Sequence, residues 1–291
     1  MNLTFSAQGQ SWPVKLNDKA ERTQKALLAA LPMQLQLHTP KIAGSHIYWH
    51  APFVEDVEGA VHVLDAKPGA FIYWPVRQFL EITFAPLQAE TAHITVLGHL
   101  DAPIAGIAAL AQSLKIGQGQ KVFNGTLQRS DNAGASAAIA SDIPNDIVQA
   151  RIALWKSCPS EIIRLTESRA IMHPAGPVFA AESEARVLHE LLWWVREEIG
   201  STEESAQRKT AALFINKAAT RLRDFCHLDE TSTILFRLEG AMQEDLPFNQ
   251  LIDEAILIAG RIGAWLDLLI PWNDINEAFR SAAPQRDLTH G

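Results

Sequence analysis

Two neighbouring runs of aromatic and β-branched residues, 70–74 and 77–84, constrain the fold of this chain more than any other feature. Prolines bound both runs, and the runs meet at residues 75–78, which is typical of two strands joined by a tight turn. The second run alternates apolar with polar side chains. Its polar members, among them Arg77 and Glu81, must therefore face water, each other or a ligand.

Other short runs in the first half also predict strands, and a turn-length segment with glycine joins the first two. Many short strands with few helices indicate a closed β-barrel, because closure removes the exposed edges of a sheet. The expected elements are strands at 3–6, 12–16, 35–39, 46–50, 61–64, 93–100 and 121–127, with helices at 19–31 and 104–114.

The composition changes after residue 129, where a stretch of small and polar residues is typical of a linker. Apolar residues then recur at helical spacing, which predicts a helical bundle. The expected helices are 147–155, 160–168, 182–200, 205–226, 230–243 and 249–279. We therefore expect an α+β chain with a barrel domain at 1–129, a linker at 130–146 and an all-α helical bundle domain at 147–291.

Charge and cysteine content narrow the function classes. The net charge of −8 over 291 residues argues against nucleic-acid binding, which needs a basic stripe. The two cysteines, Cys158 and Cys226, form no CxxC pair, so neither a disulfide framework nor a zinc site is expected. No apolar run reaches the length of a membrane span. A cytoplasmic protein that has no membrane partner and no bound metal is expected.

The order of elements in the first half resembles the cyclophilin-like barrel. The residues that carry the resemblance are 67–72, 78–82 and 93–100, together with the helix that follows. The catalytic arginine of cyclophilins stands in a strand whose counterpart here is 44–50, and that stretch contains no arginine. The resemblance therefore implies the barrel fold but argues against prolyl isomerase activity.

The second half resembles the helical domain of cucumopine and mikimopine synthases, on residues 159–169, 173–177 and 181–186. The resemblance implies an enzyme that condenses an amino acid such as histidine with a 2-oxo acid, closes a ring onto the imidazole and needs no nicotinamide. No glycine-rich dinucleotide fingerprint follows any expected strand, which agrees with a reaction without a cofactor. The expected partner is a small anionic substrate.

Such a condensation needs a base and cations that hold carboxylates. Glu81 is a candidate base and Arg77 a candidate carboxylate clamp, because positions i and i+4 of a strand share a face. The alternative is a solvated pair. His50 and His99 stand at strand ends and are candidate proton carriers, or else rim histidines bonded to backbone or water.

Aromatic and basic side chains supply candidate substrate contacts. Tyr48, Tyr73 and Trp74 are candidates to stack on an imidazole, although such aromatics usually belong to a core. Arg164, Arg169 and His173 are candidates to hold carboxylates, with ion pairs between the two halves as the alternative. Asp267, Trp265 and Trp272 are expected to serve packing.

The enzyme hypothesis depends on one geometric expectation. The helical half should cover the open end of the barrel and bring the candidate catalytic and substrate-binding side chains together. A different class of function is a binding or assembly module, in which the barrel keeps a ligand pocket without catalysis. In that case the bundle would mediate homo-oligomerisation, which the amount of apolar helix surface favours.

Overall fold

The computed structural model contains the predicted hairpin at the expected place. Strand β6 (Ala70–Trp74) pairs antiparallel with β7 (Phe79–Thr83) through a single 3-10 turn, η2 (Pro75–Arg77), and Gln78 follows it with a φ of 55°. Arg77 therefore lies in the turn and not on the strand that carries Glu81. The structure describes residues 1–41, 44–88, 91–131, 142–168 and 175–282.

The strands form one nearly closed antiparallel barrel, as predicted. Its order is β3-β9-β1-β2-β8-β6-β7-β4, and β5 pairs with β8. Backbone hydrogen bonds of 2.8 and 3.2 Å between His38 and Tyr48 join the two ends of this order. The other strands are β1 (Asn2–Ala7), β2 (Gln10–Leu16), β3 (Met33–Leu37), β4 (His46–His50), β5 (Val61–His62), β8 (His93–Leu100) and β9 (Phe123–Arg129).

Alternation along β4 and β7 separates a barrel core from an outer face. Ile47 and Trp49 belong to the barrel core, as do Leu80 and Ile82 on the neighbouring strand. Because successive side chains of a strand point to opposite faces, the residues between them lie on the outside of the barrel. These outward positions are His46, Tyr48 and His50 on β4, and Phe79, Glu81 and Thr83 on β7.

The second half is helical, as predicted, and surrounds its own buried core. Two predicted boundaries are wrong. The helix expected from 182 begins at Ala175, within the segment expected to be a loop, and the helix expected at 249–279 breaks before Pro271. The helices are α1 (Glu21–Ala29), α2 (Ile104–Ile116), α3 (Asn145–Lys156), α4 (Ser160–Glu167), α5 (Ala175–Glu197), α6 (Glu204–Asp224), α7 (Asp229–Ala241), α8 (Phe248–Leu269) and α9 (Trp272–Ala282).

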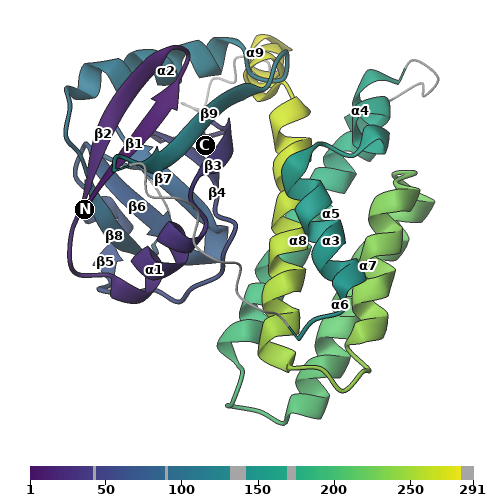
Figure 1. Ribbon diagram of the computed structural model, residues 1–291. Coiled ribbons are helices and arrows are strands. Elements are labelled where there is room, and N and C mark those ends of the chain that lie inside the picture. Colours follow the sequence, from purple (N-terminus) through teal and green to yellow (C-terminus); the bar gives the residue numbers. More distant parts are fainter. Residues whose placement is uncertain (42–43, 89–90, 132–141, 169–174, 283–291) are drawn as a thin grey trace, which may run out of the picture.

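The helical half packs against the barrel wall at β4 and η2 and not over an open end of the barrel, contrary to expectation (Figure 1). Helix α8 lies next to β4, and α5 lies next to η2. Gly260 on α8 permits this approach, because a Cβ there would stand 2.6 Å from the side-chain oxygen of Gln78. The division into separate domains at 130–146 stays a prediction, and residues 132–141 lie outside the described part.

Among the described residues, no single helix is both long and apolar enough to cross a membrane. Helices α8 and α9 together meet the length and composition test as a pair bent by 58°, but most of α8 is buried in the helical core.

Candidate active site

Glu81 is a fully buried carboxyl group on the outer face of β7. Neither of its oxygens has a hydrogen-bond partner in the described part of the chain, and His46 Nε2 lies 3.9 Å from Oε2. Burial raises the pKa of Glu81 to about 8. The carboxyl group is therefore mostly protonated at neutral pH but close to its titration point. That state suits a group that both gives and takes a proton.

Asp267 on α8 has the opposite environment, because four donors surround its carboxylate. Oδ2 accepts hydrogen bonds from His38 Nδ1 at 2.7 Å and from the Tyr48 hydroxyl at 3.2 Å. Oδ1 contacts Lys41 Nζ at 2.9 Å and accepts from Trp272 Nε1 at 3.0 Å. Although burial alone would raise its pKa, the His38 hydrogen bond and the Lys41 charge hold it well below the usual range. Asp267 is thus a fixed negative charge.

The charge on Asp267 determines which ring nitrogen of His38 carries the proton. Burial lowers the pKa of His38 and outweighs the opposing effect of Asp267, so the ring is neutral. Its Nδ1 donates to Asp267, which leaves the lone pair on Nε2, a buried atom with no partner. Tyr48 stays a phenol, because burial and Asp267 raise its pKa well above the ordinary value. A carboxylate that orients an imidazole in this way is a common arrangement for a base.

Aromatic rings join the two ends of this cluster. Tyr48 stacks on Phe79 with ring centroids 4.2 Å apart, and Phe79 meets His50 edge-on at 5.0 Å. Tyr48 also stands opposite Glu81 in the sheet register. The side chains of His46 and Lys41 are 11% and 24% exposed, so the cluster meets solvent at their edge. We call His38, Lys41, His46, Tyr48, His50, Phe79, Glu81 and Asp267 the interface cluster.

The interface cluster contains three residues that the sequence singled out, namely Glu81, His50 and Tyr48. His50 lies at the end of β4, its Nδ1 is buried without a partner, and burial lowers its pKa well below the ordinary value. His50 is therefore neutral and can carry a proton on either ring nitrogen.

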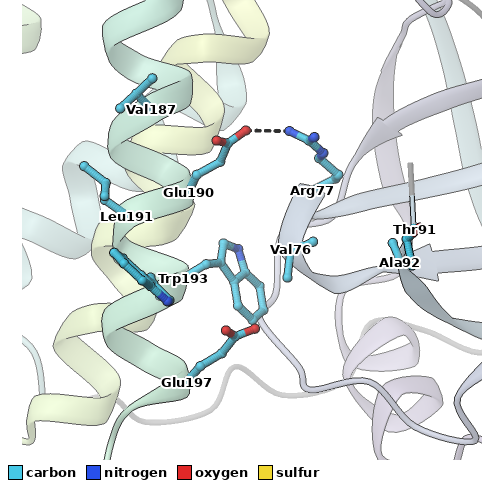
Figure 2. Close-up of a pocket in the computed structure, with 10 residues that line it drawn as sticks. Val76, Arg77, Thr91, Ala92, Val187, Glu190, Leu191, Trp193 and Glu197 are labelled. Atoms are coloured by element: carbon cyan, nitrogen blue, oxygen red, sulfur yellow. Dashed lines mark hydrogen bonds and ion pairs between the residues drawn. The ribbon is translucent and has the colours of Figure 1, made fainter. Parts of the chain in front are cut away.

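Arg77 lies apart from Glu81. It pairs with Glu190 on α5 at 2.5 Å and borders a surface pocket of about 460 Å³ between η2 and α5 (Figure 2). Trp193 and Trp194 also line this pocket, and Trp194 is 64% exposed. The structure therefore gives Arg77 an ion pair with the helical half and does not bring it to the same place as Glu81.

The other predicted site residues are dispersed. Tyr73 is buried in the barrel core, where its hydroxyl accepts from the Glu55 backbone N–H. Trp74 is buried in a small cluster on the barrel's outer face. His99 is exposed on β8. Arg164 is exposed on α4, bonds Ser160 and lies 3.9 Å from Glu230. The last two candidates, Arg169 and His173, lie outside the described residues.

Sequence reasoning missed much of the interface cluster. Asp267, which we expected to serve packing, is its centre, and neither His38 nor Lys41 was singled out. The one available signal was the His-x-Tyr-x-His alternation at 46–50, which places three polar side chains on one face of a strand. Nothing local to residue 267 predicts its four donors.

Metal ligation has no support in the described part of the chain. No group of three or more histidine, cysteine, aspartate or glutamate side chains is arranged there to hold an ion. Whether the chain uses a cofactor stays a prediction.

This chain therefore has the fold of a nearly closed antiparallel barrel with a helical bundle packed on its wall. No family model matches the chain, and the search of curated proteins finds no match. Among solved structures, McbB in complex with tryptophan matches with a TM-score of 0.74. The two are 14% identical, and the match covers 95% of this chain and 99% of that one. At this identity the likeness shows the shared fold of the whole chain.

Proposed function

We propose that this chain is an enzyme that condenses the amine of an amino acid with a 2-oxo acid without a nicotinamide cofactor, as cucumopine and mikimopine synthases do. The observation that carries the proposal is Glu81, a buried carboxyl without a hydrogen-bond partner and with a pKa of about 8. Keeping such a group is costly to stability, and strongly perturbed groups of this kind concentrate at catalytic sites.

The chemistry asks one group to act first as an acid and then as a base. The amine adds to the oxo carbon, and the resulting hydroxyl leaves as water when Glu81 supplies a proton, which gives a protonated imine and the Glu81 carboxylate. The aromatic ring of the amino acid then attacks the imine carbon. The Glu81 carboxylate takes the proton from the attacked ring carbon, which restores both the aromatic ring and the protonated acid.

The amine substrate in this proposal is an amino acid with an electron-rich ring. The resemblance to cucumopine synthases favours histidine. The similar solved structure holds tryptophan, which favours an indole. Both rings have a nucleophilic carbon placed to close a ring onto an imine. Tyr48, Phe79 and His50 make this side of the interface cluster aromatic, which suits a substrate with either ring.

The test is to incubate the purified chain with histidine or tryptophan and with pyruvate or 2-oxoglutarate. The expected product is an adduct that has the summed mass of the two substrates less one water, by mass spectrometry. Borohydride reduces an open imine but not the closed ring, so an adduct that resists it reports the cyclisation. No adduct above the enzyme-free rate across a panel of aromatic amino acids would refute the proposal.

Three variants locate the chemistry, and two of them form a matched pair. Glu81→Gln keeps the shape of the side chain but cannot exchange its proton, so we expect at least a hundredfold fall in kcat. Tyr48→Phe removes a hydroxyl that Asp267 binds, whereas Tyr73→Phe removes one in the barrel core. Only the first of these phenylalanine variants should reduce activity. Equal effects of the two would argue against the interface cluster as the site.

Binding without catalysis is the second candidate function, and the pocket of Figure 2 favours it. Trp194, Val187 and Val76 are large exposed apolar side chains that line this pocket. A ligand or a second copy of the chain would bury them, which fits the expected homo-oligomer. Sedimentation velocity of the chain and of Trp194→Ser tests assembly through this surface. A monomer at all concentrations would remove the argument.

A further inference from the structure

Arg261 is a buried arginine halfway along α8 that has no carboxylate partner among the described residues. Its side chain is 2% exposed. Nε donates to the Leu154 carbonyl at 3.2 Å, and Nη2 donates to the side-chain oxygen of Gln36 on β3. The guanidinium carbon lies 4.2 Å from the ring centroid of Trp265 and 5.4 Å from that of Trp155.

Neutral acceptors and ring faces do not cancel the charge of this group. Burial lowers the pKa of Arg261 to about 10, so it stays a cation at neutral pH. A buried ion without a counter-ion costs free energy, because the lost hydration is not replaced. Arg151 on α3 shows the usual solution in this fold, since its Nε meets Glu254 at 2.6 Å. The uncompensated charge of Arg261 therefore calls for an anion.

Arg261 borders the interface cluster. Its partner Gln36 and His38 are two residues apart on the same edge of the barrel, and the His38 ring lies 5.7 Å from the ring of His50. The Arg261 charge also contributes to lowering the pKa of both histidines. The buried Nδ1 of His50 and Nε2 of His38 have no partner. Two buried ring nitrogens without a partner among the described residues thus belong to rings that the charge of Arg261 reaches.

We propose that Arg261 and His50 form the anion subsite that receives the carboxylate of the oxo-acid substrate. Nε and one Nη2 proton are already engaged, so the Nη1 and remaining Nη2 N–H groups supply the planar pair of donors for the two carboxylate oxygens, and His50 supplies an Nδ1–H donor. His38 offers its Nε2 lone pair beside this anion, where it accepts the N–H of the substrate amine. The identity of the anion as a substrate rests on the proposed function, whereas its binding does not.

The experiment measures anion binding directly by isothermal titration of the full-length chain with pyruvate and with 2-oxoglutarate. Methyl pyruvate is the control ligand, because it keeps the size and the oxo group but lacks the charge. We expect both acids to bind and to raise the melting temperature with concentration. Methyl pyruvate should bind at least tenfold more weakly. Equal binding of the ester, or no binding of either acid, overturns the proposal.

Two arginine variants separate a binding role from a structural one. Arg261→Met removes an uncompensated charge, so the ligand-free variant should melt at the same or a higher temperature than the original chain, and its affinity for pyruvate should fall at least tenfold. Arg151→Met breaks an ion pair, so it should melt lower and bind pyruvate normally. Undiminished binding by Arg261→Met refutes the subsite. A melting temperature of Arg261→Met as low as that of Arg151→Met shows a structural role and also refutes it.

A third variant tests the geometry of the donors. Arg261→Lys keeps the charge but lacks the planar fork, so it should bind pyruvate with intermediate affinity, and full affinity would refute the subsite. The outcomes also separate this proposal from the condensation. Charge-dependent binding that needs Arg261 in a chain without condensation activity upholds the subsite alone. Condensation by a chain whose binding ignores Arg261 refutes the subsite alone.

Discussion

Replacing Glu81 by glutamine should stabilise this protein at high pH and leave its stability unchanged near pH 4.5. The reason is that the folded chain holds the carboxyl proton to a pKa of about 8, while the ordinary value is 4.5. Between these two pH values the unfolded chain has lost the proton and the folded chain retains it. The contribution of the protonated Glu81 carboxyl to the free energy of unfolding is therefore fully present below pH 4.5 and is lost as the pH rises through 8.

The size of the stability difference follows from the interval between the two pKa values. A shift from 4.5 to about 8, at 1.36 kcal/mol for each pKa unit, corresponds to about 5 kcal/mol at pH 9. Glu81 is completely buried, so solvent does not screen this contribution. Glutamine has nearly the same shape and no proton to lose. The stability of Glu81→Gln relative to the original chain should thus grow from near zero at pH 4.5 to several kcal/mol at pH 9.

Urea denaturation of both chains between pH 4.5 and 9 measures this difference, and all groups common to the two chains cancel in it. Glu197→Gln, which changes an exposed carboxylate on α5, is the matched control. An NMR titration of the Glu81 side-chain carboxyl carbon reports the same transition directly. A stability difference that stays constant over this range would refute the argument that burial keeps Glu81 neutral.

Three further substitutions and one control test the packing within the helical half and against the barrel. Gly260→Ala places a Cβ 2.6 Å from Gln78 Oε1 and 2.9 Å from His189 Cδ2, so it should lower the free energy of unfolding by about 1–3 kcal/mol in thermal denaturation. The control, Gly240→Ala on α7, meets nothing within 4 Å and should raise the free energy of unfolding by about 0.5–1 kcal/mol. Asp267→Asn leaves Lys41 with Glu182 alone, so the free energy of unfolding in thermal denaturation should fall by about 2–4 kcal/mol. An unchanged free energy of unfolding would argue against the four-donor arrangement. Glu161→Gln weakens the bonds from the backbone N–H groups of Glu230 and Thr231 at the start of α7 and should cost about 2 kcal/mol in urea denaturation.

Local patterns were sufficient for most of the fold. Proline boundaries and period-two alternation predicted the hairpin β6–β7, and helical spacing predicted α3 to α8 to within a few residues at most ends. The misplaced start of α5 shows the limit of such rules. The Ala-Gly-Pro sequence at 175–177 is typical of a loop, but it forms the first turn of this helix, where proline is tolerated because its missing N–H needs no partner.

The sequence was less informative about the candidate site. Tyr48 could be nominated because an aromatic ring can stack on an imidazole, and Glu81 because alternation places polar side chains on one face of a strand. Arg77 was nominated by the same rule and stands elsewhere, because the 3-10 turn takes it off the strand. No rule of spacing could have selected His38 and Asp267, whose side chains meet at 2.7 Å across 229 residues.

By itself, the sequence determined the α+β class and the order of the elements, because these depend on periodicity and on turn residues that act locally. Only the tertiary structure decided that Glu81 is neutral, that Asp267 is charged and that Arg261 has no counter-ion among the described residues. These properties depend on which groups lose their water and which regain a partner. That exchange takes place only where α8 packs against the wall of the barrel.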